Sequence, residues 1–198
     1  MSRPRLLADN LILDRAISVF WQRGYSAASL RDLTSATGLS AAALYHRYKD
    51  KDGLFVAAIN RYADIGLTGR LARLATAADP LGAISQFFAE IIGLCDNDPD
   101  HLGCLLVNSC LDGGLMSAQA RSVVHQRLGE IEHFFLANLQ RAAALGQLAP
   151  HSEPTLLAEI LNATILALRV LARIDPDPAK RRRIADQALR HITHRTKE

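Results

Sequence analysis

Residues 38–55, GLSAAALYHRYKDKDGLF, bring together side chains that bind anions and polar groups. Tyr45 and His46 follow three alanines, and Lys49 and Lys51 come shortly after them. Lys51 falls in the first turn of a predicted helix, where a cation opposes the helix dipole. A phosphate held at this helix N-terminus, with both lysines beside it, accounts for that placement. The spacing therefore predicts phosphate binding.

Motifs for catalysis and metal binding are missing from the chain. The sequence has no G-x-S-x-G, no Walker lysine, no G-x-G-x-x-G and no H-E-x-x-H. Cys95, Cys104 and Cys110 are odd in number, and with His101 they match no recognised zinc spacing. We therefore expect no enzyme, no metal and no cofactor.

The elements that position these side chains are predicted to be helices, because apolar residues recur with a period of 3.6 and no stretch alternates like a strand. Ser29 with Asp32 forms a predicted capping box, Gly24 and Gly38 stop helices, and Asp50 is a predicted N-cap. Nine helices are expected, at about 8–23, from Ser29 to Gly38, from Ser40 to before Asp50, from Asp50 past Ile65, and at about 81–96, 101–111, 117–145, 155–174 and 179–194.

Two short helices joined by a glycine-containing turn, after a supporting helix, form a helix-turn-helix. Its second helix is of a size that enters a DNA major groove. Leu44 and Tyr48 are predicted to face the core, and the opposite arc of this helix carries Ala41, Ala42, Tyr45 and His46.

Charge is uneven along the chain. Residues 1–49 carry a net charge of +4, residues 180–198 carry +5, and the part between them carries −6. A basic N-terminal module is typical of a nucleic-acid partner. The basic C-terminal helix is predicted to be solvated beside a dimer interface, and a second nucleic-acid patch is the alternative. Without a signal peptide, and with residues 160–168 far shorter than the roughly 20 a membrane span needs, the chain is predicted to be cytoplasmic.

Residues 12–55 resemble the DNA-binding domain of the TetR/AcrR family of bacterial regulators. The residues that follow the family's order and spacing are Phe20, Gly24, Tyr25, Ser29, Leu33, Gly38, Ser40, Leu44, Tyr45, Tyr48, Lys49, Lys51 and Leu54. The resemblance implies an all-α homodimer with a three-helix DNA-binding domain at residues 1–50. Residues 51–198 are then a larger ligand-binding and dimerisation domain, which pairs through its last two helices.

The resemblance also assigns contacts to double-stranded DNA. Tyr45, Lys49 and Lys51 match phosphate-contacting positions, and the positions that meet base edges or backbone are Arg31, Ser40, Ala41, Ala42 and His46. Arg31 is the nearby side chain able to form two hydrogen bonds to guanine. The two alanines offer only apolar contact to thymine methyl groups, so we expect DNA shape to add to specificity.

A small-molecule pocket is predicted in the C-terminal domain. Polar residues among apolar helix faces, together with phenylalanines, are its candidate lining: Asn108, His125, Asn162, Phe87, Phe88 and Phe134. Cys104 is a further candidate, because some relatives that respond to electrophiles carry Gly-Cys-Leu at a comparable position. A small buried core cysteine is the alternative for this residue.

Together these patterns predict a dimeric one-component transcriptional regulator, a repressor that binds a palindromic operator and is released by a small-molecule effector. Two alternatives stay open. One is a thiol-based electrophile or redox sensor of the same fold that uses Cys104. The other is a helical ligand-binding protein whose DNA-binding module is vestigial.

Overall fold

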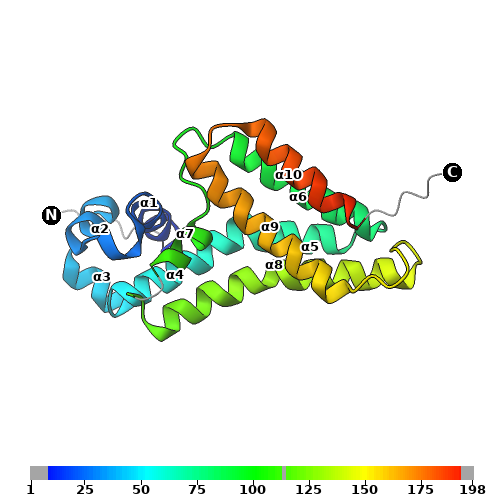
Figure 1. The fold of residues 1–198 in the computed structure, drawn as a ribbon. Helices are drawn as coiled ribbons and strands as arrows, with labels where there is room; N and C mark the ends of the chain where they lie inside the picture. The colour runs from blue at the N-terminus through cyan, green and yellow to red at the C-terminus, as the bar shows by residue number, and fades with distance from the viewer. Residues whose placement is uncertain (1–8, 113–114, 193–198) are drawn as a thin grey trace. The chain divides into compact units, whose positions relative to one another are not determined.

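The computed structural model of the chain describes residues 9–112 and 115–192 (Figure 1). Every regular element in these two ranges is a helix, which confirms the predicted all-α class. The nine predicted helices are present when the continuous run α4, η1 and α5 is counted once. In chain order the elements are α1 (Asp9–Ala27), α2 (Leu30–Thr37), α3 (Ala41–Tyr48), α4 (Lys51–Ala63), the π-helical turn η1 (Asp64–Thr68), α5 (Gly69–Ala75), α6 (Pro80–Asp96), α7 (Leu105–Leu111), α8 (Ala118–Ala144), α9 (Pro154–Ile174) and α10 (Pro178–Arg190).

The described residues form two compact units. The first contains the residues up to Leu67 together with Asn108–Arg127, and the second contains Thr68–Val107 and the residues from Leu128 on. The predicted domain boundary after residue 50 falls where α4 begins, and α4 is part of the first unit.

The core of the first unit lies where α1 packs on α2 and α4, and where α3 packs on α4. Phe20 and Phe55 meet edge to face with ring centroids 5.0 Å apart, and Tyr25 meets Phe55 at the same distance. Both phenylalanines are completely buried. Their rings hold α1 against α4, and α4 in turn supports α3.

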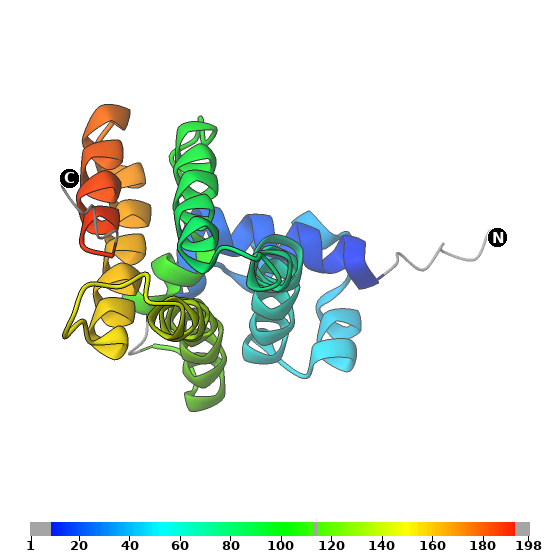
Figure 2. The ribbon, with the colours of Figure 1, turned by 90° about the vertical axis from the view of Figure 1, so that its right-hand side faces the viewer.

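The second unit is built on a cluster of four phenylalanines. Phe87 lies 5.5 Å from Phe134 and 5.4 Å from Phe135, and Phe88 lies 5.8 Å from Phe135, measured between ring centroids. All four rings are buried. Helices α6, α9 and α10 pack on one another in this unit, and Figure 2 shows them side by side.

Two helix ends differ from the sequence prediction. A kink at Gly24 interrupts α1 directly after its predicted end at about Arg23, but its φ of 77° and ψ of 165° are not those of the left-handed cap expected there. α7 begins at Leu105 rather than His101, because His101 and Gly103 have positive φ angles of 52° and 70°. The carboxylate of Asp98 accepts hydrogen bonds from the backbone N–H groups of Leu102 at 3.1 Å and Gly103 at 2.7 Å. These bonds take the place of the expected helical turn.

α9 is also more apolar than the segment 160–168 suggested. By length and composition alone, this 21-residue helix would be able to cross a membrane. In the structure Leu161, Ile165 and Leu168 are buried in the second unit, whereas other apolar residues of the helix are exposed.

Candidate DNA-binding surface

The eight side chains predicted to contact DNA lie on α2, on α3 and the residues that cap it, and at the start of α4. Arg31, Ser40, Ala42, Tyr45, His46 and Lys49 are exposed, whereas Ala41 and Lys51 are half-buried. Tyr45 has 39% of its surface exposed, while Leu44 beside it has only 1%. The predicted division of α3 into a core face and an outward face is therefore present.

Local hydrogen bonds fix both helices of this surface. Ser29 and Asp32 form the predicted capping box at the start of α2, and Gly38 ends α2 in the left-handed conformation with φ 72°. The hydroxyl of Ser40 accepts from the N–H of Ala43 at 3.2 Å and so caps α3. These caps place α3 after a turn of defined geometry, as a recognition helix requires.

At the C-terminal end of α3, Tyr48 is partly buried and Arg47 pairs with a carboxylate of α1. Tyr48 is half-buried, its hydroxyl has no hydrogen-bond partner, and burial raises the pKa of its phenol. Arg47 forms an ion pair with Asp9 at 2.9 Å. The side chain of Arg47 is thereby drawn toward α1.

Lys49 connects α3 to α4 in a strained backbone conformation. Its φ of 71° and ψ of −56° form a three-residue turn, in which the N–H of Asp50 donates to the carbonyl of Tyr48 at 2.9 Å. Such a conformation costs a non-glycine residue roughly 1–3 kcal/mol. Because a lysine occupies this strained position and its side chain is exposed, we expect its charge to have a function.

Lys51 has partners within the protein, which changes the explanation given for it from sequence. Its amine donates to the carbonyl of Ser26 at 3.3 Å and lies 4.6 Å from the centroid of the Tyr25 ring. Burial lowers the pKa of this amine, against the opposing effect of the nearby carboxylates of Asp112 and Asp52. These carboxylates offset the unfavourable dipole, so a bound phosphate is not needed to explain a cation in this turn.

The N-terminus of α4 already carries a capping carboxylate. The carboxylate of Asp50 accepts from the N–H of Gly53 at 2.7 Å, so a phosphate would have to approach an end that carries an acidic cap. Crowding in this turn explains the glycine at position 53. A Cβ at this position would lie 1.9 Å from the carbonyl oxygen of Tyr48.

Sequence reasoning missed the side chains that brace this surface. Asp112 accepts from the backbone N–H of Tyr25 at 2.8 Å and from the hydroxyl of Ser26 at 3.0 Å. The phenol of Tyr25 donates to Asp52 at 2.5 Å, and burial together with this bond raises its pKa well above the usual value. The Gly24-Tyr25 pair belongs to the pattern matched in sequence, but no local signal marks Asp112.

The seven residues predicted for a ligand pocket are spread over both units. Phe87, Phe88 and Phe134 belong to the buried aromatic cluster. Asn162 donates to Glu132 at 2.9 Å, and its own carbonyl oxygen is buried without a partner. Asn108 and His125 belong to the first unit, and Cys104, in the second, is half-buried and in no disulfide.

Of the seven, Phe88 lines a groove of the second unit. All seven stay predictions as ligand contacts, because lining a groove does not show that a ligand binds there. Among residues 9–112 and 115–192, no group of three or more histidine, cysteine, aspartate or glutamate residues is placed to hold a metal ion.

Two family models match this chain, one in its N-terminal part and one over more than half of its length. The family model "Bacterial regulatory proteins, tetR family" covers residues 12–58, and "Tetracyclin repressor-like, C-terminal domain" covers residues 80–188. The chain belongs to the TetR family. Members of this family are DNA-binding transcriptional regulators and not enzymes, which confirms both the resemblance and the expectation of no enzyme.

Individual TetR-family proteins match over most or all of their length. The transcriptional repressor ComR of Escherichia coli K12 is 32% identical over 189 residues, which is 95% of this chain and 90% of ComR. A CifR cysteine mutant complexed with 26-base-pair operator DNA is 29% identical, with a TM-score of 0.84 over 95% of this chain and 98% of that one. The reduced form of Escherichia coli NemR shares the fold at 19% identity, with a TM-score of 0.85 over 96% of this chain and all of that one.

Proposed function

We propose that this TetR-family regulator is a cytoplasmic repressor that binds a palindromic operator as a homodimer and is released by a small-molecule effector. The observation that carries the proposal is the outward face of α3, where Tyr45, His46 and Lys49 are exposed while Leu44 anchors the helix in the core. ComR, which is named a repressor, and CifR, which is complexed with operator DNA, support it.

In this proposal α3 enters the major groove. Tyr45 and Lys49 contact phosphates, and His46 reaches base edges or backbone beyond the small Ala41 and Ala42. Arg31, exposed on α2, binds guanine through two parallel hydrogen bonds. Lys51 has a double role, because its amine also holds Ser26 and Tyr25 in place.

Pairing of two chains is supported by an apolar stripe on the outside of α9. Exposed apolar residues recur along this helix at alternating spacings of four and three, which is the pattern of a helix that packs against another helix. Two alanines in the middle of the stripe allow a close approach. The stripe consists of Leu156, Ile160, Ala163, Ala167, Val170 and Ile174.

Binding to DNA is tested by fluorescence anisotropy, using the operator that the purified protein selects from random DNA, at several salt concentrations. We expect Lys49→Gln to weaken binding to all sequences alike and to reduce the salt slope by about one. Arg31→Gln should instead relax the preference at one base pair.

The matched control is Arg183→Gln, which removes an exposed cation from α10. We expect it to leave operator binding unchanged, and a loss equal to that of Lys49→Gln would favour the second basic patch. If the wild-type protein selects no DNA at all, the DNA-binding module is vestigial and the proposal fails.

A thiol sensor is the second candidate for the release step. Cys104 is half-buried rather than fully buried, so a small electrophile has partial access to it. Release of the operator by peroxide or N-ethylmaleimide, and loss of that release in Cys104→Ser, would establish this route. Release that persists in Cys104→Ser excludes Cys104 as the sensor.

A further inference from the structure

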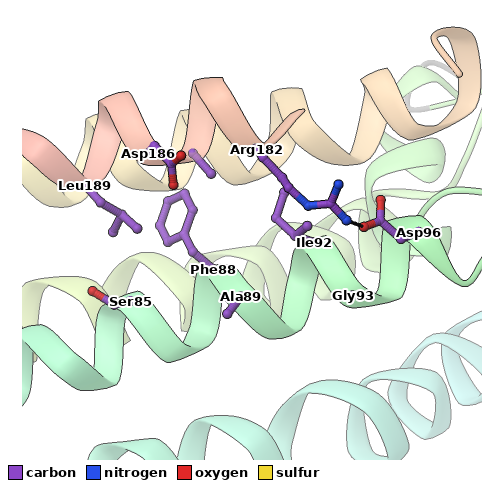
Figure 3. A pocket seen from close by; sticks show the side chains of 10 residues that line it. Ser85, Phe88, Ala89, Ile92, Gly93, Asp96, Arg182, Asp186 and Leu189 are labelled. Carbon is purple, nitrogen blue, oxygen red and sulfur yellow. Dashed lines mark hydrogen bonds and ion pairs between the residues drawn. The ribbon is translucent and has the colours of Figure 1, made fainter. Parts of the chain in front are cut away.

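A groove of about 490 Å³ runs between α6 and α10 in the second unit (Figure 3). It exists because α6 presents only small residues along this line, namely Ser85, Ala89 and Gly93, at i, i+4 and i+8. A Cβ built on Gly93 would meet no atom within 4 Å, so the space beside this residue is open. Phe88, Ile92 and Leu189 supply apolar surface to the same groove.

The two ends of the groove differ in charge. At one end, Asp96 binds the guanidinium of Arg182 and, at 3.1 Å, that of Arg181. At the other end, Asp186 forms no ion pair with any residue in the described part of the chain. Figure 3 shows the carboxylate of Asp186 above the ring of Phe88, while Arg182 points away toward Asp96.

We infer that this groove binds a small amphipathic amine, with its apolar body between α6 and α10 and its ammonium group at Asp186. At the exposed Asp186, an amine meets a carboxylate that has no cationic partner among the described residues, beside the apolar surface of Phe88 and Leu189. An anion would instead have to compete with Asp96 for the already paired guanidinium of Arg182. The carboxylate of Asp186, unpaired within the residues described, therefore favours a cation at its end of the groove.

The role of this amine as effector rests on the proposed function, because an effector requires a ligand-released regulator. Binding of the amine to the groove does not depend on that function. α10 belongs to the pair of helices proposed to form the dimer interface. A ligand that separates α10 from α6 changes the support of that interface, which is the kind of differential binding that effector control requires.

Three probes that share a phenylbutyl group test the ligand class: phenylbutylamine, phenylbutanol and phenylbutyrate. Titration calorimetry on the full chain without DNA should give affinities in the order amine, alcohol, carboxylate. An exposed ion pair predicts a preference of about two- to fivefold for the amine over the alcohol. That preference should fall to about one in Asp186→Asn and stay unchanged in Asp100→Asn, which alters an exposed carboxylate outside the groove.

Gly93→Leu tests the location. It fills the open space of the groove, and it replaces glycine by a better helix former, so the fold is expected to be kept. All three probes should lose binding in this variant, with an unchanged circular dichroism spectrum as the folding control. The inference is wrong if the amine binds equally well to Asp186→Asn and Gly93→Leu, or if no probe binds the wild type at millimolar concentration.

Tighter binding of phenylbutyrate than of the amine, lost in Arg182→Gln, would also overturn the inference, because it would identify an anion site. The operator assay separates the two proposals. Loss of amine binding in these variants with intact operator binding concerns the groove alone, and failure of operator selection in the wild type concerns the proposed function alone.

Discussion

At the scale of single residues, the turn between α3 and α4 depends on the absence of one side chain. Gly53→Ala would place a Cβ 1.9 Å from the carbonyl oxygen of Tyr48, so the turn that carries Lys49 must shift. We expect a loss of about 1–3 kcal/mol in the free energy of unfolding, measured by urea denaturation, together with weaker operator binding.

The matched control is Gly129→Ala in the exposed part of α8, where an added Cβ meets nothing within 4 Å. This change should raise the free energy of unfolding by about 0.5–1 kcal/mol, because alanine is the better helix former. Equal effects of the two substitutions would show that backbone crowding at Tyr48 does not set the turn.

Sequence could predict residues whose partners are local, and it failed where partners are distant. Ser29 caps α2 through Asp32, and Asp50 caps α4, because such caps join residues only three positions apart. Asp112 braces Tyr25 across 87 positions, a pairing that no local pattern encodes. For the same reason the dipole argument for Lys51 omitted Asp112, which helps to stabilise its charge.

At the scale of elements, the contact between α5 and α6 depends on one carboxylate. Glu90 accepts hydrogen bonds from Arg70 at 2.9 Å and from Arg73 at 2.7 Å. Burial on its own would raise the pKa of Glu90, but the bonds from Gln86, Arg73 and Arg70 outweigh it and lower the pKa to about 2. The bonds to ionised Glu90 therefore stabilise the fold above the ordinary pKa of 4.5, and this stabilisation is lost as the pH falls toward 2.

Glu90→Gln is therefore expected to lower the free energy of unfolding at pH 7 by roughly 1–3 kcal/mol, after allowance for solvent screening. The difference from the wild type should shrink between pH 5 and pH 2, as the wild-type carboxylate takes up its proton. Urea denaturation across this range measures it, with Glu159→Gln on an exposed part of α9 as the control. A difference that is independent of pH would refute the ion-pair explanation.

The helices were predictable from sequence to the extent that apolar periodicity and caps define them. α2, α3, α6 and α9 begin within a residue or two of the predicted positions. α7 was predicted four residues too long, because the backbone of residues 101–103 is set by Asp98 and by two positive φ angles rather than by apolar pattern. The groove between α6 and α10 could not be predicted from sequence either, because it depends on which small residues of α6 face α10.

At the scale of the whole molecule, the proposed repressor binds its operator as a dimer, and we propose that the apolar stripe on α9 forms the dimer interface. Ala167→Glu places a charge in the middle of the stripe, where a second copy would bury it. We expect the dimer dissociation constant, measured by analytical ultracentrifugation, to rise at least about 100-fold, which corresponds to about 2.7 kcal/mol. Operator affinity should fall with it, because a monomer contacts a single half-site. Ala143→Glu, on an exposed part of α8, should change neither quantity. A dimer that withstands Ala167→Glu would place the interface elsewhere, and would leave the exposed stripe without a partner.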